Sequence, residues 1–421
     1  MQKCWVNWNL TKSIALISWM NYSILFMNVR VQAVISRYFD YNSTTPLHPL
    51  VQEVMTKALE TYGNPSSIHS VGRNAKVALH SAREQIAALL KCEPSELYMT
   101  SGGSESNNWV IKGYLSRWAG TRFHVISSVI EHPSIRETLR YWCRFAGGDV
   151  TFVPVDEQGT ISPEIVLNAI RPDTKLISIM LANNETGMIQ PIREIAAAAR
   201  SKGIFVHTDA VQAFGKIPTH VEELGVDALS FSIHKLYGPK GVGGLYVNKA
   251  HLLEPLIHGG GQEQGLRSGT ENVIALLGAA EACRVARTEM EHLYGRMTAY
   301  KRLLVNQLSI LAPNLRVNGT LDPARTLANT LNIAIPGIRG EALAAYLDQI
   351  SGIAISVGSA CSSNHEKKLS YVLQEMGLDE KEIRSSVRIS MGLFTEESDI
   401  QYFLQSMERS LAHFLHCMPS Q

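Results

Sequence analysis

The sequence predicts an α/β protein whose larger domain holds a mainly parallel sheet and whose smaller domain is α+β. Two observations support this prediction. Short, nearly continuous apolar runs such as residues 175–182 alternate with amphipathic helical stretches, which is typical of a parallel sheet with helices on both faces. Polar or charged residues follow several of these runs, at the edge where open α/β sheets bind their ligands. From about residue 273 the pattern becomes helical and then mixes single strands with helices.

The composition is ordinary for a soluble globular protein. Of the 421 residues, 45% are hydrophobic and 18% are charged, which allows two or three domains. The formal net charge is +1 and there are no long runs of Lys or Arg, so we expect no direct nucleic-acid binding. The cysteines lie far apart, without a C-x-x-C pair or metal-ligand spacing, so we expect reduced thiols, no metal site and a cytoplasmic location. They are Cys4, Cys92, Cys143, Cys283, Cys361 and Cys417.

Residues 1–37 differ in kind from the rest of the chain. They contain no acidic residue, and polar residues interrupt their apolar pieces at 13–20 and 22–29, so we expect no membrane-spanning helix. We expect an N-terminal extension that is disordered or that results from a wrongly assigned start, because the globular pattern begins abruptly at Tyr38. An organelle presequence and a weak membrane anchor remain alternative interpretations.

The remaining chain divides into two expected domains. The large domain covers residues 51–290, and the small α+β domain combines residues 38–50 with residues 291–421. The expected elements of the small domain are helices at 297–308 and 340–350, strands at 330–336, 353–358 and 386–392, and a terminal helix.

The first segments after residue 37 are loops around one helix. Residues 40–49 (DYNSTTPLHP) form a turn-rich opening, and residues 50–62 have the spacing of an amphipathic helix. Residues 63–73 (GNPSSIHSVGR) form a loop of small polar residues that ends at a helix start. Such a loop brings backbone N–H groups against a ligand in some proteins and is an ordinary surface loop in others.

Residues 97–111 (LYMTSGGSESNNWVI) predict an anion site. A short strand leads into a glycine turn, and a helix starts near Glu105. Free N–H groups and the positive end of the helix dipole attract an anion at such a helix start. Gly103 permits close approach of the backbone, and Ser104 adds a hydroxyl. A plain strand-to-helix turn is the alternative.

Two further strands end in side chains suited to a cofactor. His132 follows the apolar strand in residues 123–135 and precedes Pro133, the expected first residue of a helix. Its flat ring has the right shape to stack on an aromatic cofactor, although a lone histidine after a strand is more often structural. Asn184 follows the strand at 175–182, where its amide suits a substrate carboxylate or a phenolic oxygen of the cofactor.

The strand that begins at Ile204 ends at Asp209, and Gln212 follows one helical turn later. A carboxylate at that edge holds a pyridine nitrogen protonated, which makes a pyridoxal cofactor an electron sink. An aspartate that caps the following helix is the alternative interpretation.

Residues 230–244 (SFSIHKLYGPKGVGG) supply the reactive group that such a cofactor needs. Lys235 follows a buried strand at 227–233 and precedes a glycine-rich turn. A partly desolvated lysine there forms a Schiff base with the aldehyde of pyridoxal 5'-phosphate (PLP), and Ser232 and His234 offer donors for the phosphate. A solvated loop lysine is the ordinary alternative. Asp209 and Lys235 in one βαβ unit are the ordered pair that a PLP site requires.

Two later segments add candidates. The glycine-rich loop 256–273 carries Arg267, Ser268 and Thr270, and a loop of this length implies a function or disorder. Cys361 follows a turn of small residues and precedes a polar stretch, which predicts an exposed thiol with His and Lys nearby to stabilise a nucleophilic thiolate. An unreactive surface cysteine is the alternative.

Taken together, these motifs resemble the PLP-dependent cysteine desulfurases of the NifS/IscS type, in the class V aminotransferase superfamily, from about Tyr38 to the C-terminal helix. The matching strings occur in order and close to the family's spacing. They are DYNSTTPLHP, GNPSSIHSVGR, TSGGSESNN, EHPSI, NNETG, HTDAVQAFGK, SFSIHKLYGPKGVGG, RSGTENV and SVGSACSS. The resemblance implies PLP fold-type I, the aspartate aminotransferase-like architecture, and a homodimer.

The resemblance also implies roles for the matching residues. Lys235 would form the Schiff base and shuttle protons, His132 would stack on the ring, and Cys361 would attack the substrate sulfur and carry a persulfide. Asp209 would hold the pyridine nitrogen, and Gln212 would contact the phenolic oxygen. The candidate cofactor-binding residues are Gly103, Ser104, His132, Asn184, Asp209, Gln212, Ser232, His234, Lys235 and the partner subunit's Thr270.

Three positions depart from the family's pattern. The family usually has Ala-Thr where this chain has Gly103-Ser104, and the stretch after Cys361 is more charged and about one residue longer here. The family commonly has an arginine that binds the substrate carboxylate at the position of Leu393. The loss of such a bidentate pair would weaken substrate binding unless Arg388 or Arg267 replaces it.

The resemblance implies an enzyme that converts L-cysteine to L-alanine and leaves sulfur as a persulfide on Cys361. A selenocysteine lyase, another class V PLP enzyme and a catalytically weak sulfur-transfer scaffold are the alternatives. The expected partners are L-cysteine, a second copy of the chain and a sulfur-acceptor protein. Iron–sulfur cluster assembly, tRNA thiolation and DNA phosphorothioation are all compatible pathways.

Overall fold

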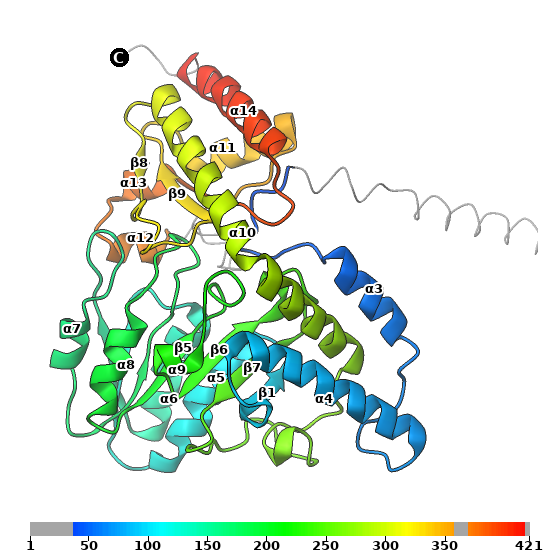
Figure 1. Ribbon diagram of the computed structural model, residues 1–421. Coiled ribbons are helices and arrows are strands. Elements are labelled where there is room, and N and C mark those ends of the chain that lie inside the picture. The colour runs from blue at the N-terminus through cyan, green and yellow to red at the C-terminus, as the bar shows by residue number, and fades with distance from the viewer. Residues whose placement is uncertain (1–36, 358–368, 417–421) are drawn as a thin grey trace, which may run out of the picture.

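The computed structural model describes residues 37–357 and 369–416. Most of the expected N-terminal extension, and Cys361, lie outside these ranges. Figure 1 shows a larger lower part built around a seven-stranded sheet and a smaller upper part around a three-stranded sheet. The long helix α10 (Val273–Leu311) runs through both parts.

The large sheet has the strand order β1-β7-β6-β5-β4-β2-β3. Its strands are parallel except β7, which pairs antiparallel with both β1 and β6. The expectation of a mainly parallel sheet is therefore confirmed, and the carboxyl ends of its parallel strands meet at one edge. The strands are β1 (Leu97–Thr100), β2 (His124–Ser128), β3 (Asp149–Val153), β4 (Thr174–Ser178), β5 (Phe205–Asp209), β6 (Ala228–Ser232) and β7 (Gly243–Val247).

Helices bury both faces of this sheet, which explains the continuous apolar runs in the sequence. Successive side chains of a strand point to opposite faces. Ile177 of β4 belongs to the core formed with α4, α8 and α10, whereas its neighbour Leu176 belongs to the core formed with α5 and α6. The helices of the large part are α3 (Pro49–Ala58), α4 (Ser70–Leu90), α5 (Gly103–Leu115), α6 (Pro133–Ala146), α7 (Pro163–Asn168), α8 (Ile192–Arg200) and α9 (Val221–Leu224).

The small part has its own antiparallel sheet, in the order β10-β9-β8, and its own core. Phe39 packs into that core, so the chain enters the small part before it builds the large one. The elements are β8 (Arg316–Val317), β9 (Thr330–Ala334), α11 (Gly340–Tyr346), α12 (Tyr371–Glu375), α13 (Glu380–Arg384), β10 (Ser386–Ser390) and α14 (Glu397–His416).

The expected domain boundary at residues 290–291 falls inside α10. The first half of the helix, for example Ala279, belongs to the large core, whereas Leu304 in the second half belongs to the small core. We propose that the two domains meet along this helix. A separate helix at 297–308 is not observed, because the helix from Val273 continues through that range to Leu311.

Another difference concerns the strand expected at residues 353–358. In the described part of this range, Ala354 and Ser356 form only isolated bridges, to Tyr38 and Arg388. The backbone switches partner between the two bridges, so the apolar alternation there does not build a regular ladder. Within residues 37–357 and 369–416, no helix is long and apolar enough to cross a membrane.

Candidate active site

A cavity of about 300 Å³ receives residues from both parts of the molecule. Its walls include the carboxyl ends of β5 and β6, the start of α5 and the side chain of Arg388 from β10. Nine of the ten residues expected to bind the cofactor line this one cavity. They are Gly103, Ser104, His132, Asn184, Asp209, Gln212, Ser232, His234 and Lys235.

Lys235 lies in a short 3-10 turn, Ile233–Lys235, directly after β6. Its Nζ donates to the carbonyl oxygens of Asn42 (2.5 Å) and Ser43 (2.6 Å). Both carbonyls belong to the turn-rich opening segment, which therefore crosses the cavity edge and holds the lysine amine in place. The strand expected before Lys235 is confirmed.

Asp209 ends β5 and is buried. One carboxylate oxygen accepts a hydrogen bond from the backbone N–H of Val211 at 2.9 Å, and the other accepts from Asn107 Nδ2 at 2.7 Å. Asn107 comes from α5, so two elements that are distant in sequence fix the orientation of the carboxylate. Asp209 thus lies at a strand end with its position set from both sides.

His132 is the N-cap residue of α6, where its Nδ1 accepts a hydrogen bond from the backbone N–H of Ser134 at 3.2 Å. The same nitrogen lies 2.8 Å from Ser134 Oγ. Burial lowers the pKa of His132, the nearby Asp209 carboxylate opposes that shift, and Lys235 adds to it. A neutral, oriented imidazole ring at the cavity wall is the result.

The start of α5 forms the anion-binding end of the cavity. The N-cap residue Gly102 provides no capping side chain, so the first N–H groups of the helix remain available to a ligand. A Cβ atom on Gly103 would lie 2.4 Å from Val211 Cγ2, so only glycine fits there without a shift. Burial, with Lys235 next, lowers the pKa of His234 to about 4, and its Nδ1 lies 3.1 Å from Thr44 Oγ1.

Arg388 is the guanidinium group of the cavity. It donates to the backbone carbonyl of Asn184 at 2.9 Å, to Asp40 Oδ1 at 2.6 Å and to Ser43 Oγ at 2.9 Å. Its Nε and the Asn184 side-chain oxygen are buried without a hydrogen-bond partner in the described part of the chain. Both groups have unmet capacity, which a polar ligand would satisfy.

Leu393 does not line this cavity, so it is not at the position of a cavity arginine. Its N–H donates to Tyr237 Oη and its carbonyl accepts from Arg296, both at 2.6 Å. Arg267 is committed elsewhere, since it pairs with Glu105 at 2.8 Å. Of the two arginines considered as replacements, Arg388 is the one that reaches the cavity.

Four residues of the site were not singled out by the sequence. Asn107 follows Ser104 by one helical turn, and that spacing places both side chains on one face of α5. Asn42 and Ser43 lie in the turn-rich opening, where nothing local indicated a contact to Lys235. Ser134, which orients His132, occupies the second helical position after it.

Two expected site residues remain. Thr270 is exposed and does not line the cavity of its own chain. Cys361 lies outside the described residues. Among residues 37–357 and 369–416, no cluster of His, Cys, Asp and Glu is arranged to hold a metal ion, and Cys92, Cys143 and Cys283 are free thiols.

The residues present fit PLP. The cavity combines an uncapped helix start for a phosphate, a lysine amine for an aldehyde and an oriented carboxylate for a pyridine nitrogen. These groups are the ones the cofactor's three functional parts require.

Comparison with known proteins agrees with this site. Residues 37–403 match the family model described as Aminotransferase class-V. The match covers most of the chain, and the chain therefore belongs to the class V aminotransferase family.

Its relatives within that family are more specific. A protein named cysteine desulfurase IscS from Dictyoglomus turgidum is 41% identical over 373 residues, which cover 88% of this chain and 93% of that protein. A solved NifS-like protein is 38% identical, covers 90% of this chain and 100% of its own, and superposes with a TM-score of 0.84. A structure titled SspA in complex with cysteine is 36% identical, with coverages of 86% and 100% and a TM-score of 0.74. The chain belongs with the cysteine desulfurases, as the motifs indicated.

Proposed function

We propose that this protein is a PLP-dependent cysteine desulfurase that converts L-cysteine to L-alanine and carries the released sulfur as a persulfide on Cys361. The observation that carries the proposal is the meeting of nine expected residues, from five separate sequence motifs, in one cavity with the lysine amine and the oriented aspartate on its walls. Relatives named cysteine desulfurase, 41% identical over most of the chain, support it.

When bound, the cofactor would supply an aldehyde for the Lys235 amine and an electron-withdrawing ring. Gly103, Ser104, Ser232 and His234 would hold its phosphate at the start of α5. The carboxylate of Asp209, fixed by Asn107 and Val211, would hold a proton on the ring nitrogen.

The proposed substrate contacts use the two residues of the cavity wall, Arg388 and Asn184, that have a buried side-chain atom without a hydrogen-bond partner in the described part of the chain. Arg388 binds the carboxylate of cysteine, since its guanidinium is already oriented by Asp40, Ser43 and the Asn184 carbonyl. Asn184 lies beside it. Lys235 moves the proton at the substrate Cα, and His132, the N-cap residue of α6, would stack on the cofactor ring. The cysteine-bound relative SspA supports a cysteine-sized ligand in this family.

Cys361 is proposed as the sulfur acceptor. Both ends of the segment that carries it are tied to the cavity wall. Ser356 exchanges backbone hydrogen bonds with Arg388 at 2.7 and 3.1 Å, and Ser370 Oγ donates to Glu185 at 2.6 Å, next to Asn184. The Cys361 thiolate attacks the substrate sulfur, and the new S–S bond forms as the C–S bond breaks. The electron pair of the broken bond stays on the substrate Cβ, which takes up the proton of the substrate thiol. Lys235 returns the Cα proton and so completes alanine.

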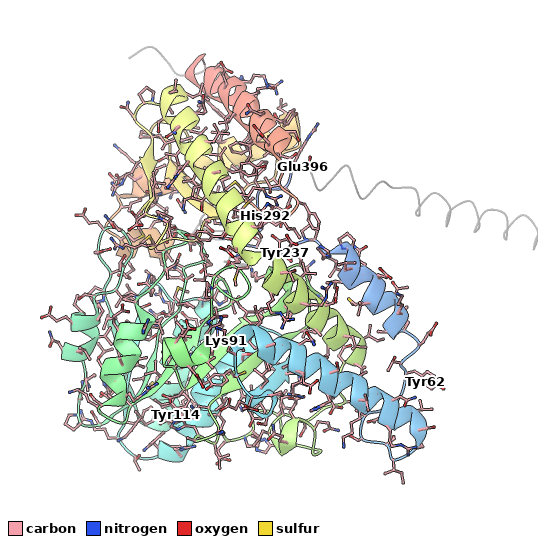
Figure 2. All side chains as sticks on the ribbon, in the orientation of Figure 1. Tyr62, Lys91, Tyr114, Tyr237, His292 and Glu396 are labelled. Carbon is pink, nitrogen blue, oxygen red and sulfur yellow. The ribbon has the colours of Figure 1, made fainter. Side chains whose placement is uncertain are left out.

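A homodimer is part of the proposal. Leu59, Tyr62 and Ile68, between α3 and α4, are 65%, 82% and 91% exposed, which is a large apolar face for a single chain. Figure 2 shows Tyr62 on the connection between α3 and α4. A second copy would cover this face, and the partner's Thr270 would reach the phosphate end of the cavity. A cytosol-like compartment is also proposed, supported by the three free thiols among the described cysteines.

Turnover of the holoenzyme with L-cysteine and a thiol reductant tests the function. Alanine and sulfide should form in equal amounts, Cys361→Ser should bind PLP and substrate yet release no sulfide, and Cys92→Ser should keep full activity. Cys92 is the matched control because burial raises the pKa of its thiol to about 12, which keeps it unreactive. Wild-type holoenzyme that makes no alanine from cysteine would exclude a desulfurase and favour the scaffold. A selenocysteine lyase would turn over selenocysteine and leave cysteine intact.

A further inference from the structure

A second lysine, Lys216, lies beside Lys235 and has no role in the site described above. It comes from the segment between β5 and α9. Lys216 and Lys235 both line a cavity of about 30 Å³, and Lys235 also lines the cofactor cavity of about 300 Å³. The two cavities therefore meet at Lys235.

The two amines bind the two oxygens of one residue, Asn42. Lys235 Nζ donates to the Asn42 backbone carbonyl at 2.5 Å, and Lys216 Nζ lies 3.3 Å from Asn42 Oδ1. Asn42 is buried and also binds Thr330 and Ser390 of the small domain, so it cannot move aside easily. The two ammonium groups are held close together on a rigid support.

Lys216 also fixes the amide of Gln212. Its Nζ donates to Gln212 Oε1 at 3.0 Å, and Gln212 Nε2 donates to the Asn42 carbonyl at 3.0 Å. Because a lysine ammonium only donates, the glutamine oxygen must face Lys216 and the amide nitrogen must face away from it. The second N–H of that nitrogen is left for an acceptor in the cofactor cavity, which Gln212 lines.

No carboxylate offsets the charge of Lys216 in the described part of the chain. Its hydrogen bonds go to the neutral oxygens of Asn42 and Gln212. Burial lowers the pKa of Lys216 to about 7, with further lowering by Lys235 and Arg388. Since Coulomb repulsion acts equally on both partners, a charge on Lys216 disfavours a charge on Lys235 as well.

We propose that Lys216 is a positioning residue that keeps the Lys235 amine neutral, and therefore nucleophilic, while it locks Gln212 with its amide nitrogen toward the cofactor. This inference rests on the proposed PLP function. It assigns to Lys216 the part that a neighbouring cation plays beside other imine-forming lysines.

The other charged groups around Lys235 do not replace Lys216. Arg388 is offset by Asp40 at 2.6 Å. The Asp209 carboxylate has the opposite sign and favours a protonated Lys235. His132 and His234 both have lowered pKa values and are neutral at pH 7. Among the described residues, Lys216 is therefore the cation beside the reactive amine that no carboxylate offsets, and it carries its charge below about pH 7.

The experiment follows capture of PLP by the cofactor-free protein. The rate constant is measured by absorbance between pH 6 and 10 for wild type, Lys216→Met, Lys216→Gln and Lys216→Arg, and borohydride reduction with peptide mapping locates the link on Lys235. Lys301→Met is the matched control, since Lys301 is another buried lysine that donates only to neutral oxygens, those of Thr326 and Leu327 at 3.2 Å.

Lys216→Met and Lys216→Gln should shift the pH midpoint of capture upward by about one unit or more, and slow capture about tenfold at pH 6.5, where Lys216 is mostly protonated. Lys216→Arg, which keeps the charge, and Lys301→Met should follow wild type. An unchanged midpoint in both neutral variants, or an equal shift in Lys216→Arg, would overturn the assignment. Wild-type protein that forms no link at Lys235 would instead overturn the proposed PLP function, and this is known before any variant is compared.

Discussion

The position of Lys235 decides whether the site holds a cofactor covalently. Lys235 lines the same cavity as the anion-binding start of α5 and Asp209, and the carbonyls of Asn42 and Ser43 accept hydrogen bonds from its amine. Lys235→Ala should abolish the visible absorbance of the lysine-bound cofactor and reduce turnover below detection. Lys240→Ala, a change at an exposed lysine of the same loop, should leave both unchanged. A borohydride-reducible protein–PLP link in Lys235→Ala would assign the role to another lysine.

We propose Arg388, which lines the cavity, rather than position 393 as the residue that sets substrate affinity. Arg388→Lys keeps the charge but loses the planar fork, so the KM for cysteine should rise roughly tenfold or more, as expected for a lost charge-assisted contact of about 1.5–3 kcal/mol. PLP affinity should change little. Leu393→Arg should give no gain, because Leu393 does not line the cavity. Steady-state kinetics decide the matter: a lower KM in Leu393→Arg together with an unchanged KM in Arg388→Lys would reverse the assignment.

Individual site residues were predictable where they end a strand of the parallel sheet. Asp209 and Lys235 each follow an apolar run, and the edge rule for open sheets brings such ends together. Asn107 was not predictable in the same way, since its bond to Asp209 joins residues 102 positions apart and only the folded sheet creates it. The expectation that position 393 faces the substrate was wrong for a similar reason, because a position in a motif does not show which way its side chain faces.

At the scale of elements, the junction between α5 and the turn after β5 determines how closely the backbone approaches the phosphate. Gly103→Ala would place a Cβ 2.4 Å from Val211 Cγ2 and push the helix start away. PLP affinity should fall about tenfold or more in Gly103→Ala, whereas Val211→Ala alone should change it little. The double variant should recover most of the loss, because the clashing methyl is gone. Fluorescence titration of the cofactor-free proteins measures this, and no recovery in the double variant would point to the helix backbone instead.

The elements themselves were predictable to different degrees. Strands that are buried on both faces are recognisable in the sequence as apolar runs, and β4, β5 and β6 coincide with such runs. The helical pattern from residue 273 was recognised, but the helix expected at 297–308 is the second half of the same helix, α10. Each half of α10 packs on a different core. The strand expected at 353–358 is not observed in the described part of that range, because the alternation there serves two separate bridges rather than one ladder.

At the scale of the whole molecule, buried carboxyl groups make stability depend on pH. Burial raises the pKa of Glu185 to about 7, and the bond from Ser370 opposes this only in part. The unfolded chain ionises Glu185 above about pH 4.5, whereas the folded protein keeps the carboxyl group neutral up to about pH 7. The contribution of Glu185 to the free energy of unfolding is therefore fully present below about pH 4.5 and falls as the pH rises toward 7. Glu185→Gln should remove that slope and raise the stability at pH 8 by roughly 1–3 kcal/mol.

Urea unfolding of the holoenzyme between pH 5 and 8.5 measures this slope. Glu131, whose pKa burial raises to about 8, adds a slope of the same sign that Glu185→Gln leaves in place. His207 acts at the other end, because burial lowers its pKa to about 3 and its contribution is lost as the pH falls below 6.5. A Glu185→Gln variant with the wild-type slope between pH 5 and 7 would show that the carboxylate is not buried in solution.

The assembly gives the last prediction, because the proposed partner residue Thr270 is testable by complementation. Thr270 is exposed and absent from the cavity of its own chain, so if it acts across the dimer its loss damages the neighbour's site. Thr270→Val should weaken PLP binding about tenfold, and Lys235→Ala should be inactive. A heterodimer of the two variants then contains one complete site, formed by Lys235 of one subunit and the partner's Thr270, and should show half of the wild-type activity and one equivalent of tightly bound PLP. If Thr270 acts on the site of its own subunit, this heterodimer has no complete site. A heterodimer without tightly bound PLP would therefore disprove the shared site. Ile68→Asp should abolish the complementation, because it should separate the subunits.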